Sequence, residues 1–67
     1  MEKIQLKVAG MSCQHCEKAV VNILLDIGAE AVTADAKSGL VDVEFDPTHL
    51  TVDVIKKEIF DEGYEVV

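Results

Sequence analysis

The chain of 67 residues contains no tryptophan and no arginine, and its aromatic side chains are one tyrosine and two phenylalanines. Because hydrophobic residues still make up 49% of the sequence, the core must be built mainly from Val, Ile, Leu and Ala. A chain of this length buries only about 60% of the surface that its unfolded form exposes. We therefore expect one domain, residues 1–67, with a thin aliphatic core.

Long apolar runs are also missing, since none approaches the ~20 residues that a membrane-spanning helix needs. The first residues, Met1–Gln5, lack the apolar stretch of a secretory signal. We expect a soluble cytoplasmic protein without membrane insertion. A mature chain whose signal has been removed stays open as the alternative.

Positive charge is scarce, because 13 Asp and Glu residues stand against six Lys residues and the net charge is -7. Nucleic acids and anionic lipids are bound through Lys and Arg, so this balance argues against both as partners. The acidic surface either keeps a small protein soluble or steers it toward a basic patch on a partner protein. Steering predicts that association slows as the salt concentration rises.

Cysteine is limited to Cys13 and Cys16. A disulfide-stapled secreted domain usually has at least four cysteines, and a structural zinc site usually takes about four ligands. One pair at this spacing fits neither pattern. The pair is therefore interpreted as a functional site and not as a structural disulfide or a structural zinc site.

Alternating apolar and polar residues predict strands over residues 3–8 and 41–46. Weaker patterns indicate further strands over residues 29–35 and 64–67. A tight turn that ends in glycine is expected over residues 36–39, and we call it the hairpin turn.

Apolar residues at helical spacing predict one helix from about Cys16 to Gly28 and a second over residues 52–62, capped by Thr51. The order is therefore strand, helix, strand, strand, helix, strand. This order is that of the ferredoxin-like α+β fold. We expect a βαββαβ sandwich, with two helices on one face of a four-stranded antiparallel sheet.

That topology brings three loops to the same end of the sheet. They are the segment Gly10–Cys16, the turn Lys37–Gly39 and the pair Gly63–Tyr64. His49 falls at the opposite end, one strand length or roughly 17 Å away. His49 is therefore interpreted as a plain surface residue.

The residues that can carry chemistry lie in Gly10–Cys16, which reads Gly-Met-Ser-Cys-Gln-His-Cys and which we call the cysteine segment. Cys16 falls in the first turn of the predicted helix, where the helix dipole and unpaired N–H groups favour a thiolate. Cys13 precedes the helix and should be the more exposed of the two. Two thiolates can bind opposite sides of a soft ion such as Cu(I) and leave room for an incoming ligand.

The same CxxC spacing also occurs in thiol–disulfide redox centres. Such centres belong to a larger βαβ fold and normally have small residues or proline between their cysteines, whereas Gln14 and His15 stand here. We find no catalytic carboxylate pair, nucleophile–base pair or phosphate loop in the sequence. A metal carrier that is not an enzyme is therefore favoured, with a thiol–disulfide redox protein as the alternative of another class.

The cysteine segment resembles the GMxCxxC motif of heavy-metal-associated domains, and it looks especially like bacterial copper chaperones of the CopZ type. Gly63–Val66 resembles the closing G-Y-D-V segment of the family, and residues 39–46 match its third strand. The likeness covers the whole chain in the same order of elements. It implies a cytosolic copper chaperone that hands Cu(I) to a partner protein.

The resemblance implies that Cys13 and Cys16 ligate Cu(I). It also implies that Met11 packs beneath the cysteine segment and that Tyr64 lies beside it. Zinc-handling relatives often have Asp where this chain has Ser12, and this difference favours Cu(I). Zn(II), Cd(II) and Hg(II) stay open as alternatives, because thiolates bind all three.

His15 lies between the two ligands in sequence, but its place at the start of the helix should turn it outward. A transient role as a third ligand, or in a copper-linked dimer, is the alternative. Glu17 is interpreted as a helix-start residue that suits the dipole. Lys18 either offsets the negative charge of the copper complex or is simply solvated. Gly10 breaks the first strand and begins the loop.

By the same resemblance, the partner is the metal-binding domain of a copper-exporting P-type ATPase or a copper-sensing repressor. A thiolate from the partner would join to form a three-coordinate intermediate, and the bonds would then exchange one at a time. An excised domain of such an ATPase is the alternative identity. The apo chain is expected to be a folded monomer, and a copper-bridged dimer stays open because two sulfurs at an exposed site can be shared.

Overall fold

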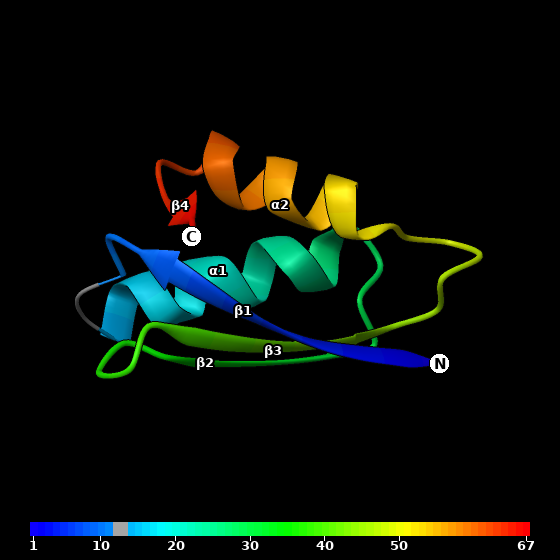
Figure 1. Cartoon of the computed structure of the whole chain (residues 1–67), viewed down its shortest axis with the longest axis horizontal. Helices are drawn as coiled ribbons and strands as arrows, with labels where there is room; N and C mark the ends of the chain where they lie inside the picture. The colour runs from blue at the N-terminus through cyan, green and yellow to red at the C-terminus, as the bar shows by residue number, and fades with distance from the viewer. Residues whose placement is uncertain (12–13) are drawn as a thin grey trace.

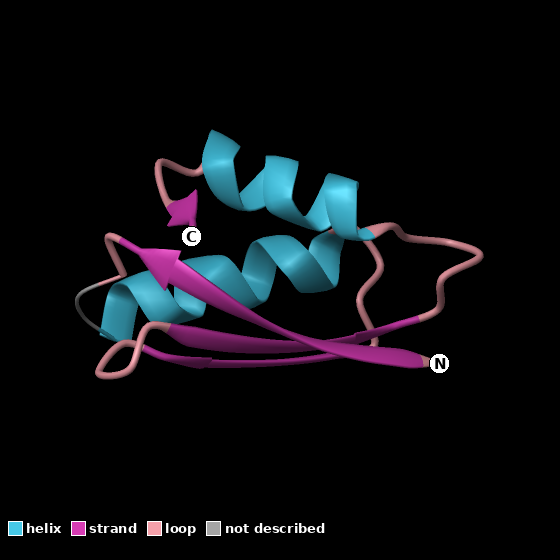
Figure 2. Cartoon of the chain, in the orientation of Figure 1, coloured by secondary structure: helices cyan, strands magenta, loops and turns pink. Residues whose placement is uncertain are grey.

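The computed structural model describes residues 1–11 and 14–67. The strands form one antiparallel sheet in the order β2-β3-β1-β4, and both helices lie on one face of it (Figure 1, Figure 2). The predicted ferredoxin-like α+β fold is therefore confirmed. The elements are β1 (Glu2–Ala9), α1 (Gln14–Asp26), β2 (Ala31–Asp35), β3 (Leu40–Phe45), α2 (Val52–Asp61) and β4 (Glu65–Val66).

The core lies between the helices and the inward face of the sheet. β1 and β3 pair so that Leu6 lies opposite Val41, which brings the alternating apolar residues of both strands to one face. No polar or charged side chain is buried in the part of the chain that the structure describes, and Phe45 is the one aromatic side chain in its buried set. Both helices add fully buried aliphatic side chains, namely Val20, Leu24, Ile55 and Ile59.

The helices differ from the prediction mainly where α1 begins. It starts at Gln14 and not at about Cys16. Gln14 and His15 are exposed, so the apolar spacing on which the prediction depends does not extend over them. α1 ends just before Gly28, as predicted. Neither described helix has the length and apolar character that crossing a membrane requires.

Two strands begin later than predicted, β2 at Ala31 and β4 at Glu65. The reason is that each preceding helix needs the same residues for its own ending. The N–H groups of Ala29 and Tyr64 donate to carbonyls of the last helical turn at 3.0 and 3.2 Å. These residues complete Schellman motifs, and the strands can start only after them.

The loops are distributed between two ends of the molecule. The end of β1, the start of α1, the hairpin turn and the loop between α2 and β4 lie at one end, on the left of Figure 1. The loop between β3 and α2, which contains His49, lies at the opposite end. The arrangement that the topology predicted is therefore observed.

Candidate metal site

Cys16 is the proposed ligand that lies within the described residues. It is the third residue of α1, and its half-buried side chain packs against the core. The first turn of a helix presents unpaired N–H groups and the positive end of the helix dipole, and both favour a thiolate over a thiol. Cys16 therefore has the setting of a metal-binding thiolate. Cys13 and Ser12 lie outside the described residues, and their roles stay predictions.

The described residues at both ends of the cysteine segment pack in or against the hydrophobic core. On the β1 side, Met11 is only 4% exposed and belongs to the same buried cluster as Val8. On the α1 side, Cys16 packs against that cluster and Val20 is fully buried within it. Both ends of the segment thus contact the same core. The contribution of Gly10 and Met11 to metal binding stays a prediction.

Tyr64 lies beside the start of the cysteine segment. α2 ends with the N–H groups of Gly63 and Tyr64 donating to carbonyls of its last turn, at 2.9 and 3.2 Å. This ending turns the chain back toward the sheet and brings the half-buried tyrosine ring close to Gly10. A Cβ atom at Gly10 would lie 3.6 Å from Cδ1 of Tyr64. The place of Tyr64 next to the site is therefore set by how α2 ends.

The hairpin turn contacts both flanks of the cysteine segment. On the β1 side, the Val8 N–H donates to the Gly39 carbonyl at 2.7 Å. On the α1 side, the Ala36 N–H donates to Oε2 of the Glu17 carboxylate at 2.5 Å. The sequence interpretation assigned Glu17 to the helix dipole and missed this bond. No local pattern signals it, because the two residues are 19 positions apart.

Gly39 allows the hairpin turn to approach β1 this closely. Its φ is 73°, in the left-handed region that disfavours residues with a Cβ atom. A Cβ atom at this position would lie 3.1 Å from the Val8 carbonyl oxygen. The glycine predicted to end the turn is thus also the residue that lets the turn contact the end of β1.

The two histidines lie in different surroundings. His15 is exposed on α1 next to Cys16. His49 belongs to the turn at the opposite end, where its side chain is 79% exposed and Nε2 lies 3.8 Å from Oδ2 of Asp46. Because His49 lies at the opposite end, it is far from Cys16.

The same turn lowers the pKa of Asp46 below its usual value. The main cause is the hydrogen bond that the Thr48 N–H donates to the carboxylate, and the Thr48 hydroxyl donates a second one.

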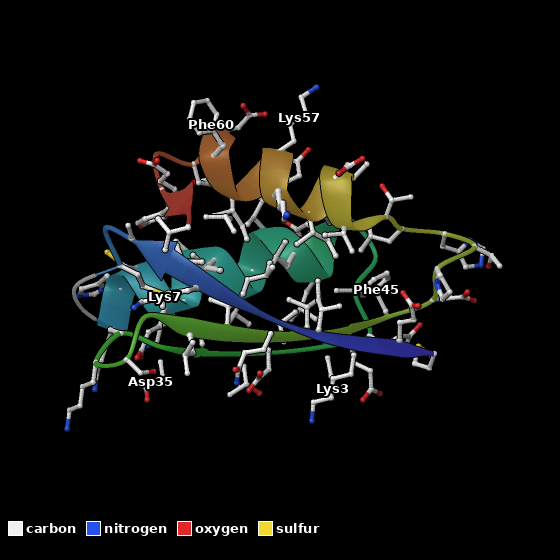
Figure 3. All side chains as sticks on the ribbon, in the orientation of Figure 1. Lys3, Lys7, Asp35, Phe45, Lys57 and Phe60 are labelled. Carbon is white, nitrogen blue, oxygen red and sulfur yellow. The ribbon has the colours of Figure 1, made fainter. Side chains whose placement is uncertain are left out.

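The remaining polar residues near the site are spread over its surface. Lys18 is exposed on α1. Lys7 of β1 and Asp35 of β2 lie toward the same end of the molecule (Figure 3). Within residues 1–11 and 14–67, no three His, Cys, Asp or Glu side chains are grouped so as to hold a metal ion.

Known proteins are similar to this chain over nearly its full length. The family model of the heavy-metal-associated domain matches residues 5–65. The copper chaperone CopZ of Bacillus subtilis (strain 168) is 45% identical over 67 residues, covering 98% of this chain and 97% of that protein. The structure of a CopZ metallochaperone superposes with a TM-score of 0.95 at 37% identity, covering 98% of this chain and 100% of the other. A copper-binding domain of a P-type ATPase superposes with a TM-score of 0.95 at 35% identity, covering 100% of this chain and 92% of that chain.

Proposed function

Since this chain belongs to the heavy-metal-associated domain family, we propose that it is a copper chaperone that binds one Cu(I) ion through the thiolates of Cys13 and Cys16. The observation that carries the proposal is the place of Cys16, half-buried in the first turn of α1. Soft thiolate ligands select Cu(I) over harder ions. The similarity to proteins named copper chaperones supports copper as the cargo.

Transfer then proceeds by exchange of thiolates at an ion that stays Cu(I) throughout. A cysteine thiolate of the partner forms a third bond to copper, and one bond to Cys13 or Cys16 breaks. A second thiolate of the partner then replaces the remaining one. Each step forms one Cu–S bond and breaks one, so no oxidant or reductant is needed. The low coordination number is what leaves room for the incoming sulfur.

The partner that fits this exchange is the metal-binding domain of a copper-transporting P-type ATPase in the cytoplasm. The close superposition of such a domain on this chain supports the assignment, because two proteins of one fold can present their cysteine segments to each other. A copper-sensing repressor is the second partner that the exchange would serve.

The same superposition favours a second identity, in which this chain is itself a metal-binding domain of a P-type ATPase. Both identities use the same two ligands, and they differ in what the chain is attached to. An open reading frame that continues from this sequence into membrane-spanning segments would support the second identity. A transcript that encodes this chain alone would support the free chaperone.

The test of the proposed site is an anaerobic titration of the reduced protein with Cu(I) in competition with a chelator. We expect tight binding of one ion or fewer per chain, loss of that binding in the Cys13→Ser/Cys16→Ser variant, and much weaker binding of Zn(II). Far-UV circular dichroism of the variant checks that its fold is kept. Tight Zn(II) binding with weak Cu(I) binding would replace copper by zinc as the cargo. Weak binding of both ions with turnover of a disulfide substrate would replace the carrier by a redox protein.

A further inference from the structure

We propose that Glu17 is a positioning residue for the copper site. Its bond to the hairpin turn fixes the first turn of α1, which carries Cys16, relative to the end of β1. This inference rests on the proposed function and deepens it, because it names a residue outside the CxxC motif that sets the geometry of one ligand.

The two flanks of the cysteine segment are tied to the same four-residue turn. Val8 precedes the segment and bonds to Gly39, the last residue of the turn, at 2.7 Å. Glu17 follows the segment and accepts a hydrogen bond from Ala36, the first residue of the turn. The hairpin turn thus bridges the strand that enters the segment and the helix that leaves it, and the Glu17 side chain supplies a hydrogen bond between the turn and the helix.

The hairpin turn is suited to act as such a bridge because its own backbone is closed by hydrogen bonds. The Gly39 N–H donates to the Asp35 carbonyl at 2.8 Å, and the Lys37 N–H donates to Oδ1 of Asp35 at 3.0 Å. The Leu40 N–H approaches Oγ of Ser38 at 3.3 Å. These hydrogen bonds restrain the backbone between the first and last residues of the turn.

The charge of Glu17 does not by itself explain its place next to Cys16. A carboxylate favours the first turn of a helix, but it repels two thiolates that carry Cu(I) as an anionic complex. Charge alone would therefore make Glu17 unfavourable for binding. The hydrogen bond from the Ala36 N–H lets Glu17 position the helix, and this role needs an acceptor oxygen but not a negative charge. A glutamine could supply the same acceptor.

The test compares Glu17→Ala, which removes the acceptor, with Glu17→Gln, which keeps an acceptor oxygen and removes the charge. Glu58→Ala is the matched control, because it removes another half-buried glutamate from a helix of the same protein. Two quantities are measured in each variant. They are the amide hydrogen exchange rate of Ala36 in the metal-free protein and the Cu(I) affinity by chelator competition.

We expect Glu17→Ala to speed the exchange of the Ala36 amide and to weaken Cu(I) binding, each by about tenfold, as loss of one hydrogen bond to a charged acceptor allows. Glu17→Gln should restore the amide protection and bind Cu(I) at least as tightly as the wild type. Glu58→Ala should match the wild type in both measurements. Circular dichroism of all variants checks their fold.

Equal changes in Cu(I) affinity for the alanine and glutamine variants would overturn the inference, because Glu17 would then act through its charge. An unchanged Ala36 exchange rate in Glu17→Ala would also overturn the inference, because the hydrogen bond would then not stabilise the contact between the turn and α1. Failure of the wild type to bind Cu(I) would instead reject the proposed function. The wild-type titration therefore separates the two failures.

Discussion

Met11 is a third sulfur-containing residue of the cysteine segment, and its burial indicates what its sulfur does. The side chain is 4% exposed and lies in the hydrophobic cluster, not at the surface where an incoming partner would meet it. Methionine fills irregular gaps in cores because it is flexible and apolar. We therefore predict that Met11 packs in the core and is not a ligand of the metal ion.

This assignment predicts different outcomes for two substitutions of Met11. Met11→Leu keeps the volume and removes the sulfur, so it should cost less than about 1.5 kcal/mol of unfolding free energy and leave Cu(I) affinity unchanged. Met11→Ala should cost about 2–5 kcal/mol, because it leaves a cavity in a thin core. Urea unfolding of the apo protein and chelator competition measure the two effects. A leucine variant with wild-type stability and much weaker Cu(I) binding would show that the sulfur is a ligand.

At the residue scale, the sequence predicts what is local and misses what depends on packing. The place of Cys16 in the first helical turn could be predicted from the apolar spacing of α1, although that spacing put the start of the helix two residues too late. The bond from Ala36 to Glu17 could not, because it depends on how α1 lies against the end of β2. A glutamate in the first turn already has a sufficient explanation in the helix dipole, and this explanation hid the tertiary contact.

At the scale of the element, hydrogen-bonded caps hold both ends of α2. Thr51 has extended backbone angles and its hydroxyl oxygen accepts a hydrogen bond from the Val54 N–H at 3.3 Å, which satisfies one of the unpaired donors at the start of the helix. At the other end, the turn through Gly63 sets the position of Tyr64. The stability of α2 thus bears on the geometry near the proposed copper site.

Thr51→Ala should lower the free energy of unfolding by about 1 kcal/mol, because the cap acceptor is lost while the residue stays exposed. Thr51→Ser keeps the hydroxyl and should stay close to the wild type. Urea unfolding followed by circular dichroism measures both variants. Equal losses in the serine and alanine variants would mean that the threonine methyl group, and not the cap, stabilises the helix.

The existence of each helix and strand was predicted well because apolar spacing is a strong signal. The ends were predicted less well because exposed residues and backbone hydrogen bonds set them. The exposed residues Gln14 and His15 extend α1 without adding to its apolar stripe. Ala29 and Tyr64 lie in the predicted strands, yet their N–H groups complete helix endings and so cannot begin strands. Hydrogen-bond competition at the junctions, which composition does not reveal, accounts for these differences.

At the scale of the whole molecule, the alternation of up and down elements sufficed to predict which loops meet. The contact of Val8 with Gly39, and the approach of Tyr64 to Gly10, fulfil that prediction. The buried core draws on both helices and on β1 and β3, whereas Cys16 is half-buried and packs against this core. We therefore expect the interior of the fold to form without a metal ion.

We accordingly predict that the reduced apo protein is folded and that Cu(I) adds to its stability by mass action. At a free Cu(I) concentration about 100 times the dissociation constant, binding to the native state alone would raise the unfolding free energy by ~2.7 kcal/mol. Anaerobic urea unfolding with Cu(I) buffered by a chelator measures the rise, and circular dichroism shows whether the apo chain is folded. A chain that gains its structure only with metal would contradict the prediction.

The size of that rise carries further information, because Cys13 and Cys16 are close in sequence and can bind Cu(I) in the unfolded chain as well. Binding to the unfolded state subtracts from the stabilisation. The measured rise therefore reports how far the fold improves on two free thiolates at the same spacing. If the Glu17 bond positions Cys16, Glu17→Ala should reduce the rise and Glu17→Gln should not. The Cys13→Ser/Cys16→Ser variant should show no rise in unfolding free energy at any Cu(I) concentration, and it serves as the reference for the other variants.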